Sequence, residues 1–217
     1  MPQKVIAIDG PSASGKGTVA QRVAEALGWA YLDSGALYRI TALHARRRGA
    51  DWADEAAVAA LAQALPAEFA AGAVLLDGED VSAAIRSEEI GMGASQVAAL
   101  PAVREALLQR QRAFLGEQGL VADGRDMGSV VFPDAVLKIF LTAGAKVRAE
   151  RRARQIGEPL SGERFERILA AIEARDEADR KRAVAPLQKL PEARLLDTSA
   201  LTIEESVKKV LDWYREK

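Results

Sequence analysis

No cysteine occurs among the 217 residues, histidine occurs once, and aromatic side chains make up only 5% of the sequence. Without cysteine the chain has no disulfide, no thiolate nucleophile and no cysteine-ligated metal, which suits a reducing cytoplasm. A single imidazole does not make a histidine cluster. We therefore interpret His44 as a surface or packing residue of a helix predicted over residues 36–48.

Long apolar runs and a dominant sign of charge are missing as well. No window approaches the ~20 apolar residues of a membrane span, and residues 1–4 lead into a short apolar stretch that lacks the layout of a signal peptide. The net charge is −1, which together with so few aromatic residues gives little support for a nucleic-acid surface. We expect a cytoplasmic protein that has neither a membrane nor a nucleic acid as a partner.

Short apolar runs of strand length alternate along the chain with longer segments of helical periodicity. These runs are residues 5–9, 30–33, 119–123, 136–141 and 195–197. The alternation predicts an α/β fold with a mainly parallel sheet and helices on both faces. Most of the runs end in small polar residues, and ligands of open α/β sheets gather at the carboxyl ends of the strands. The length favours one domain with an insertion.

The insertion is predicted where the sequence changes from a helical pattern to short apolar runs with turn residues. Between residues 65 and 94 an apolar run is followed by Asp77 and Gly78, a pair typical of a tight turn between antiparallel strands. Before it, the alanine-rich residues 53–67 predict a helix, because alanine is the best helix former.

The segment GPSASGKGT, residues 10–18, follows the first predicted strand and precedes a helix. It matches the phosphate-binding pattern G-x-x-x-x-G-K-[ST] at Gly10, Gly15 and Lys16. Gly17 departs from it, because Ser or Thr is expected there. A glycine-rich turn in this context leaves N–H groups pointing outward, so we interpret the segment as a phosphate-binding loop.

The departure leaves the ligand of a metal ion open. Thr18 or Ser14 has to be considered for contact with the phosphates or, through water, with the ion. Asp123, at the end of a predicted strand, is either a magnesium contact through water or a helix cap.

Two charged helical segments each have two interpretations. The helix predicted from Ser161 has an apolar stripe that turns charged at Arg175, Asp179 and Arg182. This end either emerges into solvent or enters a polar cleft where it meets a ligand. The arginine-rich residues 147–155 form either a solvated helix face or part of a lid that closes over phosphates and expels water.

Three longer segments carry a family resemblance: LDSGALYR at residues 32–39, GRDMGSVVFP at 124–133 and RDEADRKRAVAP at 175–186. Together with the Gly-Lys-Gly-Thr form of the loop, which nucleoside monophosphate kinases such as adenylate kinase carry, they resemble the bacterial cytidylate kinases over essentially the whole chain. The resemblance implies a five-stranded, mainly parallel sheet flanked by helices. It also implies an acceptor-binding insertion at residues 65–94 and a mobile lid at residues 148–162 within a single kinase domain, residues 1–217.

The resemblance further implies an enzyme that transfers the γ-phosphoryl group of ATP to CMP or dCMP, with Mg²⁺, in pyrimidine nucleotide metabolism. We expect it to act as a monomer. The catalytic residues implied are Lys16, Arg125 and Arg182. Those implied for ATP are Gly10, Pro11, Ser12, Ala13, Ser14, Gly15, Lys16, Gly17, Thr18, Arg151 and Arg152. Those implied for CMP are Ser34, Arg39, Ser95, Arg104, Arg125, Asp126, Arg175, Asp179 and Arg182. The metal contact implied is Thr18, through water if not directly.

The residue types implied for these sites suit the groups that they would bind. Always-charged arginine forks neutralise and orient the phosphates of two anions that repel one another. By resemblance, Asp126 accepts from the cytosine amino group, while Ser95 and Arg104 face its acceptor edge. Asp179 would bind the ribose. Arg104 has an alternative interpretation as an ordinary first-turn residue of a helix.

Two other functions remain as alternatives. One is another small-molecule kinase with the same loop, acting on UMP, AMP or an alcohol such as shikimate. The other is a nucleotide-gated switch, which the sequence disfavours because it contains no asparagine and so no Asn-Lys-x-Asp base-reading motif. The sequence also shows no histidine dyad, which fits a phosphate acceptor, since that group has its second pKa near ~6 and needs no strong base.

Overall fold

The computed structural model describes residues 3–70 and 73–217. The chain divides into two compact units. The first, which we call the sheet unit, comprises Met1–Leu32 and Phe114–Lys217, and the second, the helical unit, comprises Asp33–Ala113. The segment predicted as an insertion, residues 65–94, falls inside the helical unit, and its role in binding the acceptor stays a prediction.

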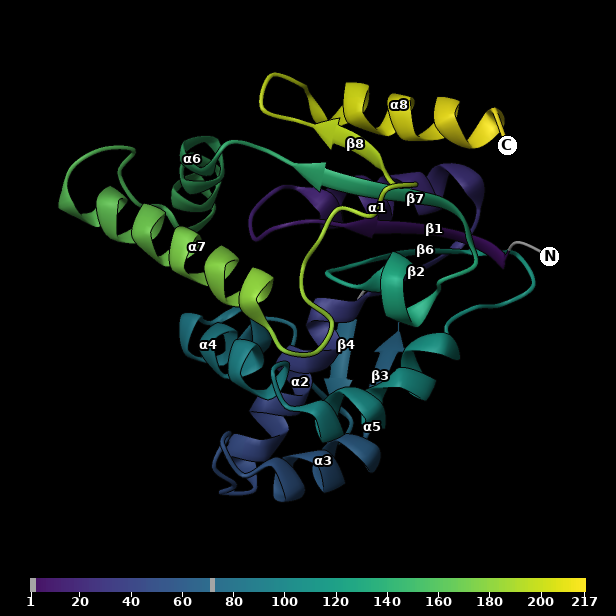
Figure 1. The fold of residues 1–217 in the computed structure, drawn as a ribbon. Helices are drawn as coiled ribbons and strands as arrows, with labels where there is room; N and C mark the ends of the chain where they lie inside the picture. The colour runs from purple at the N-terminus through teal and green to yellow at the C-terminus, as the bar shows by residue number, and fades with distance from the viewer. Residues whose placement is uncertain (1–2, 71–72) are drawn as a thin grey trace. The chain divides into compact units, whose positions relative to one another are not determined.

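The main sheet has five strands in the order β2-β6-β1-β7-β8. Their bounds are β1 Gln3–Asp9, β2 Ala30–Asp33, β6 Leu120–Gly124, β7 Ala135–Thr142 and β8 Arg194–Asp197. The central strand β1 pairs in parallel with β6 and with β7, and β7 pairs in parallel with β8 (Figure 1). The predicted sheet and all five of its strands are therefore confirmed, with ends that differ by one or two residues.

The helices of the sheet unit follow the strands. They are α1 Lys16–Leu27, the short π-helix η2 Met127–Val131, α6 Ala145–Ile156, α7 Glu163–Lys181 and α8 Ile203–Arg215. Val19 and Val23 of α1 and Val210 of α8 pack on buried residues of the sheet such as Ile6 and Ile139. This core forms because both helices bury one apolar stripe, and α6 and α7 pack on one another in a second, smaller cluster (Figure 1).

The helical unit contains α2 Ser34–Arg47, α3 Glu55–Gln63, η1 Ala84–Arg86, α4 Glu88–Val97 and α5 Pro101–Arg112. Between α3 and η1 lies an antiparallel sheet of β3 Ala67–Ala70, β4 Ala73–Leu76 and β5 Glu79–Asp80. Asp77 and Gly78 join β4 to β5 with φ angles of 53° and 79°, so the predicted hairpin turn is confirmed.

Two helix predictions need correction in detail. The helix predicted over residues 53–67 ends at Gln63, because Pro66 disfavours helical backbone at the residue before it, and the chain enters β3 at Ala67. The helix predicted from Ser161 begins at Glu163. His44 is buried in α2, as a packing residue would be. Burial, together with the nearby Arg48, lowers its pKa.

Within residues 3–70 and 73–217, none of the helices is both long enough and apolar enough to cross a membrane.

Candidate functional site

The predicted phosphate-binding loop connects the carboxyl end of β1 to α1. A Cβ at Gly10 would lie 2.0 Å from the carbonyl oxygen of Leu141 in β7, so only glycine fits there. Ala13 and Gly15 both have left-handed backbone, with φ angles of 55° and 89°, and Gly15 is the N-cap of α1. Left-handed residues in a loop, followed by the free N–H groups of a helix N-terminus, turn several N–H groups toward a common point. This is the geometry that binds an anion.

Lys16, the predicted catalytic lysine, lies close to a buried carboxylate. Its Nζ is 4.0 Å from Asp123 Oδ1, and the hydroxyl of Tyr31 donates a 2.6 Å hydrogen bond to Asp123 Oδ2. A Cβ at Gly17 would lie 3.4 Å from the hydroxyl of Tyr31 and 3.5 Å from Asp123 Oδ2. Asp123 lies within β6, and the N-cap of the helix that follows is Asp126. The helix-cap interpretation of Asp123 is therefore wrong.

The loop is anchored from the side by the end of β8 and by α6. Arg151 Nη1 donates to the carbonyl of Ser14 at 2.8 Å, and its Nη2 donates to the carbonyl of Thr198 at 2.7 Å. The hydroxyl of Thr198 contacts the Ser14 carbonyl and that of Thr142, at 3.3 and 3.1 Å. The guanidinium of Arg151 therefore lies against the backbone of the loop, and its implied role in binding ATP stays a prediction.

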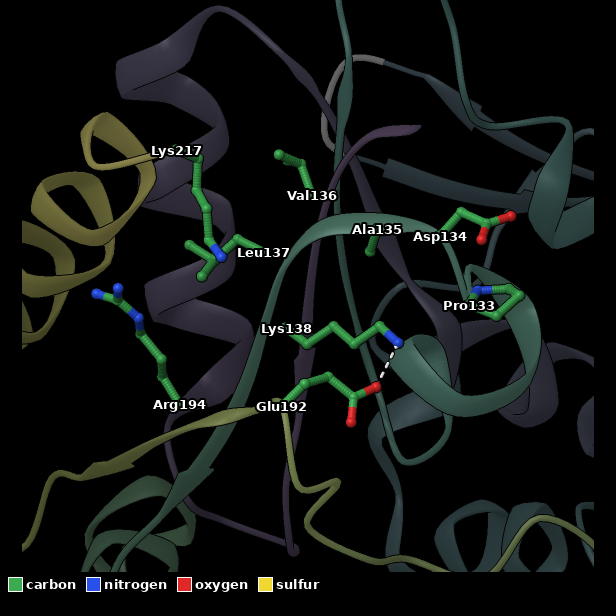
Figure 2. Close-up of a pocket in the computed structure, with 9 residues that line it drawn as sticks. All are labelled: Pro133, Asp134, Ala135, Val136, Leu137, Lys138, Glu192, Arg194 and Lys217. Atoms are coloured by element: carbon green, nitrogen blue, oxygen red, sulfur yellow. Dashed lines mark hydrogen bonds and ion pairs between the residues drawn. The ribbon is translucent and has the colours of Figure 1, made fainter. Parts of the chain in front are cut away.

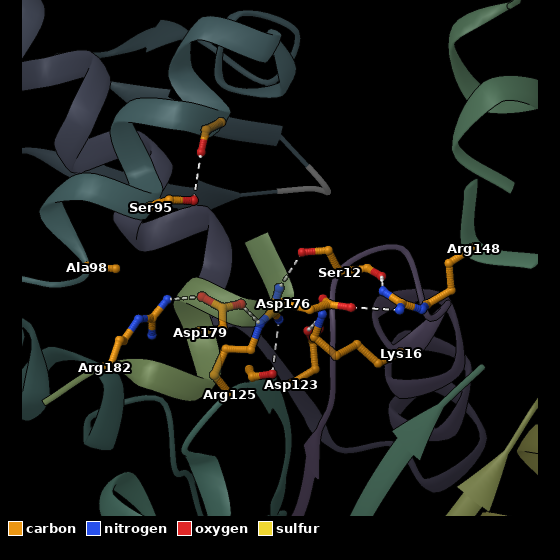
Figure 3. A network of polar contacts seen from close by, with 12 residues as sticks. Ser12, Lys16, Ser95, Ala98, Asp123, Arg125, Arg148, Asp176, Asp179 and Arg182 are labelled. Carbon is orange, nitrogen blue, oxygen red and sulfur yellow. Dashed lines mark hydrogen bonds and ion pairs between the residues drawn. The ribbon is translucent and has the colours of Figure 1, made fainter. Parts of the chain in front are cut away.

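Arg125 connects the loop to α7 (Figure 3). Its Nη2 donates to the hydroxyl of Ser12 at 3.1 Å, and its Nε donates to Asp179 Oδ2 at 2.7 Å. The other carboxylate oxygen of Asp179 accepts from Arg182. Burial alone would raise the pKa of Asp179, but Arg125 and Arg182 hold that pKa below its usual range. Arg175 also lies close enough for its charge to lower this pKa.

Asp179 near the end of α7 is therefore buried in a polar cluster, so the solvent-exposed interpretation is wrong for this residue, whereas Arg180 and Lys181 are exposed. Arg152 donates from Nη1 to Gln155 on the same helix at 3.1 Å. Its predicted role toward ATP stays a prediction.

A second buried contact joins α6, α7 and the loop, and the sequence did not indicate it. Arg148 pairs with Asp176 at 2.6 Å, and it also donates to the carbonyl of Ser12 at 3.0 Å and to that of Ala143 at 2.9 Å (Figure 3). Ser12 is thus held at its hydroxyl by Arg125 and at its carbonyl by Arg148. Although Arg148 belongs to the predicted lid segment, it therefore supports the backbone of the loop.

Asp9 precedes the loop and was predicted only as a polar strand end. It is 8% exposed, and its carboxylate accepts the N–H of Met127 at 2.8 Å and that of Gly128 at 2.9 Å. Burial raises its pKa to about 7, although these two hydrogen bonds oppose the rise. Asp126, the predicted base-reading residue, is also buried and begins the turn that Asp9 holds.

The remaining predicted residues belong to the helical unit. Ser34 is buried at the start of α2, and Arg39 Nη1 donates to the carbonyl of Ile85 at 2.7 Å. The hydroxyl of Ser95 donates to the carbonyl of Gly91 at 3.2 Å. A Cβ at Gly91 would meet the Arg39 guanidinium at 3.3 Å, so Arg39 lies against the same turn of α4.

Arg104 is buried in the helical unit as well. Its Nη1 donates to the carbonyl of Ala98 at 3.1 Å, and its guanidinium lies 5.7 Å from the ring centre of Tyr38. Arg104 does lie near the start of α5, as its alternative interpretation has it, but it is buried there and not solvent-exposed. Its predicted contact with the base stays a prediction.

Tyr31, Arg148, Asp176 and Thr198 are contacts that sequence reasoning missed. The one available signal was that Thr198 and Tyr31 belong to segments at or near the carboxyl ends of strands. A buried pair such as Arg148 and Asp176 has no local pattern, because its partners are 28 positions apart on two helices.

A cavity of about 520 Å³ lies in a different part of the sheet unit (Figure 2). Its lining includes Asp134, Lys138 and Arg194, and Lys138 is paired with Glu192 at 2.7 Å. The cavity is at the amino end of β7, whereas the loop follows the carboxyl end of the parallel strand β1. It is therefore separate from the predicted site, and Arg194 in its lining is paired with Glu216 at 2.6 Å.

Known proteins resemble the chain over nearly its full length. A model of the cytidylate kinase family matches residues 6–216. A cytidylate kinase of Neisseria gonorrhoeae is 71% identical over 213 residues, which are 98% of either chain, and one of Chromobacterium violaceum is 61% identical over 217 residues, covering 100% of this chain and 98% of the relative. In fold alone, an uncharacterized protein from Eubacterium ventriosum matches with a TM-score of 0.54 and 12% identity, over 99% of this chain and 100% of that chain.

Proposed function

Because the chain belongs to the cytidylate kinase family, we infer that it is an ATP-dependent kinase that transfers the γ-phosphoryl group of ATP to CMP or dCMP. The products are ADP and CDP or dCDP. The observation that carries the inference is the family match from residue 6 to residue 216, and the contacts around the phosphate-binding loop give it a physical basis.

The donor nucleotide is proposed to bind at residues 10–18. The N–H groups of this loop and of the first turn of α1 attract the β- and γ-phosphates. Lys16 adds a full positive charge at the same place, and Asp123, 4.0 Å away, keeps its ammonium near the loop. The double anchoring of Ser12 by Arg125 and Arg148 fixes the loop before ATP arrives, which lowers the entropy cost of binding.

The acceptor nucleotide is proposed to meet the arginine cluster of the sheet unit. Arg125 and Arg182 are held by the carboxylate of Asp179, which orients both guanidinium groups. Guanidinium groups fixed in this way stabilise negative charge that grows on a transferring phosphoryl group. Asp126 is proposed to accept from the amino group of cytosine, and Asp179 to bind the ribose.

Four residues of the helical unit are proposed to contact CMP by the same resemblance. These are Ser34, Arg39, Ser95 and Arg104. Each is buried or half-buried within its own unit, and the hydrogen bonds of the last three to main-chain carbonyls fix their side chains.

The chemical step requires no strong base from the protein. An oxygen of the CMP phosphate attacks the γ-phosphorus of ATP, the bond from that phosphorus to the β,γ-bridging oxygen breaks, and its electron pair leaves with ADP. The acceptor phosphate is largely dianionic at neutral pH, because its second pKa is near ~6. The protein therefore contributes position and charge, with Lys16, Arg125 and Arg182 neutralising the oxygens that gain charge.

The residues present fit a magnesium ion that is held mainly by phosphates and water. Within residues 3–70 and 73–217, no group of three or more histidine or acidic residues could hold a metal on its own. Mg²⁺ in kinases commonly takes only one or two protein oxygens. Thr18 is exposed at the start of α1, and Asp123 offers a carboxylate beside Lys16, so we propose these two as its contacts, through water. Mg²⁺ held there would supply positive charge that neutralises the phosphates.

Ser14, the other hydroxyl considered for this role, fits less well. Its hydroxyl is buried without a hydrogen-bond partner in the described part of the chain, and the residue is 1% exposed. A phosphate would reach it only after the loop has moved.

The proposal also covers two segments of the chain, the oligomeric state and the localisation. We propose residues 148–162 as a lid over the donor phosphates and residues 65–94 as a segment that helps to hold the acceptor. We further propose that the protein acts as a monomer in the cytoplasm.

An acceptor panel tests the proposal. Release of ADP from ATP and Mg²⁺ is measured with CMP, dCMP, UMP, AMP and shikimate, each in turn. The Lys16→Ala variant, purified in the same way, controls for contaminating kinases. We expect fast ADP release with CMP or dCMP and slow release with the others. Faster turnover of UMP, AMP or shikimate would favour the alternative small-molecule kinase, and ATP binding without acceptor-dependent release would favour a switch.

A further inference from the structure

The carboxylate of Asp9 binds main-chain N–H groups that are 118 and 119 positions further along the chain. Asp9 is the last residue of β1 and is followed directly by Gly10 of the phosphate-binding loop. Its Oδ1 accepts the N–H of Met127 at 2.8 Å, and its Oδ2 accepts that of Gly128 at 2.9 Å. Both donors belong to the first turn of η2.

The two N–H groups follow immediately after Arg125 and Asp126 in the chain. Arg125 connects Ser12 to Asp179, and Asp126 has a backbone carbonyl that accepts from Val130 at 2.9 Å. The backbone between β6 and η2 is therefore fixed on one side by strand pairing and on the other by the carboxylate of Asp9. Without that acceptor, two N–H groups at a helix start would lack a partner.

The position is an unfavourable one for a carboxylate. Asp9 is 8% exposed, and its pKa of about 7 is raised chiefly by burial. The charged groups that face it are Asp126, which raises the pKa further, and Arg125, which lowers it. From β7 the aliphatic stem of Lys138 approaches the turn at Gly128, and its ammonium is paired with Glu192. A costly buried carboxylate at a functional segment is typical of a functional role.

We propose that Asp9 is a positioning residue for recognition of the acceptor nucleotide: by accepting both N–H groups it fixes the backbone from which Arg125 and Asp126 reach the acceptor. Asp9 itself touches neither nucleotide. The proposal rests on the proposed function, because it names a determinant of CMP binding.

The test compares Asp9→Asn with Asp134→Asn and the wild type. Asp134 is exposed, so its variant matches the loss of charge without touching the turn. Asparagine at position 9 retains only one acceptor oxygen, and one N–H then lacks a partner. We expect Asp9→Asn to raise KM for CMP roughly tenfold, to change KM for ATP by less than about twofold, and to weaken the preference for CMP over UMP.

The pH dependence gives a second readout. When the pH falls below about 7, Asp9 becomes protonated in the wild type and resembles asparagine. The ratio of KM for CMP between Asp9→Asn and wild type should therefore approach one at about pH 6 and rise toward about pH 8. Titration of the CMP phosphate acts on both proteins equally and cancels in this ratio. If Asp9 had only a structural role, its replacement would affect KM for CMP and KM for ATP alike. The ratio of KM for CMP between the variant and the wild type would then not depend on pH.

The outcomes separate this inference from the proposed function. If the wild type phosphorylates CMP and Asp9→Asn shows the same KM for CMP, or equal changes in both KM values, Asp9 is not a positioning residue for the acceptor. If the wild type does not phosphorylate CMP at all, the proposed function fails first. If Asp9→Asn does not fold, amide hydrogen exchange in the wild type decides. The protection of Met127 and Gly128 from exchange, taken relative to that of the β1 amides so that the change in global stability cancels, must rise as Asp9 ionises. A pH-independent ratio overturns the proposal.

Discussion

Arg148 and Asp176 form an ion pair of 2.6 Å in which the two residues are only 5% and 3% exposed. Two further donors of Arg148 bind the carbonyls of Ser12 and Ala143, whereas Asp176 Oδ1 has no hydrogen-bond partner within the described residues. Removing one partner of such a pair leaves a buried charge without compensation, and this typically costs about 3–5 kcal/mol.

We therefore expect Asp176→Asn and Arg148→Met each to lower the free energy of unfolding by roughly 3 kcal/mol or more, measured by urea denaturation. Lys208→Met is the matched control, because Lys208 and Asp212 form an exposed pair at 2.9 Å on α8 that contributes only about 0.3–0.5 kcal/mol. Equal losses in all three variants would contradict the interpretation.

Lys16 should be required for turnover rather than for binding of the acceptor. Lys16→Ala is expected to lower kcat by orders of magnitude, because the charge that stabilises the transferring group is lost. The affinity for CMP, measured by calorimetry without ATP, should change little. A wild-type rate in this variant would defeat the assignment of the loop as the donor site.

The fold was predictable because its signals are local. The strand runs, the turn at Asp77 and Gly78 and the loop before Lys16 each depend on a few neighbouring residues. Errors occurred where a local rule was overlooked, as with Pro66 and the end of α3. The contacts that order the site, such as the pair of Asp9 with the η2 amides, join residues far apart in the sequence. Composition and periodicity carry no record of such pairings.

Asp126 is predicted to discriminate cytosine from uracil. Its carboxylate suits the amino donor of cytosine, whereas uracil presents an acceptor at the same place. Asp126→Asn should therefore reduce the preference for CMP over UMP, measured as the ratio of the two kcat/KM values. Asp134→Asn again serves as the control for the loss of one charge. An unchanged ratio would mean that Asp126 does not contact the base.

The stability of the fold should fall as pH rises through the range in which Asp9 titrates. Its folded pKa of about 7 lies above the ordinary value of 3.8, so between these values the folded protein holds one proton more than the unfolded chain. The free energy of unfolding then decreases by up to about 1.4 kcal/mol for each pH unit. The Tm of Asp9→Asn minus that of the wild type should therefore increase from about pH 5 to about pH 8. A constant difference would show that the carboxylate is not destabilised in the fold.

The glycine at position 17 allows a test of which hydroxyl serves the magnesium ion. A Cβ there would meet the Tyr31 hydroxyl at 3.4 Å and Asp123 at 3.5 Å, which are tolerable contacts, so Gly17→Ser should fold normally. If Thr18 supplies the contact in this chain, Thr18→Val should raise the Mg²⁺ concentration for half-maximal activity severalfold, since the hydroxyl that holds the ion through water is lost.

The double variant Gly17→Ser, Thr18→Val restores a hydroxyl directly after Lys16, where the general loop pattern has one. We expect it to recover most of the Mg²⁺ affinity that Thr18→Val loses, with activity titrated against free Mg²⁺ at fixed ATP. Gly17→Ser alone controls for crowding against Tyr31. If Thr18→Val leaves the Mg²⁺ requirement unchanged, the ion depends on Asp123 and the phosphates without Thr18, and Asp123→Asn should then produce the larger shift.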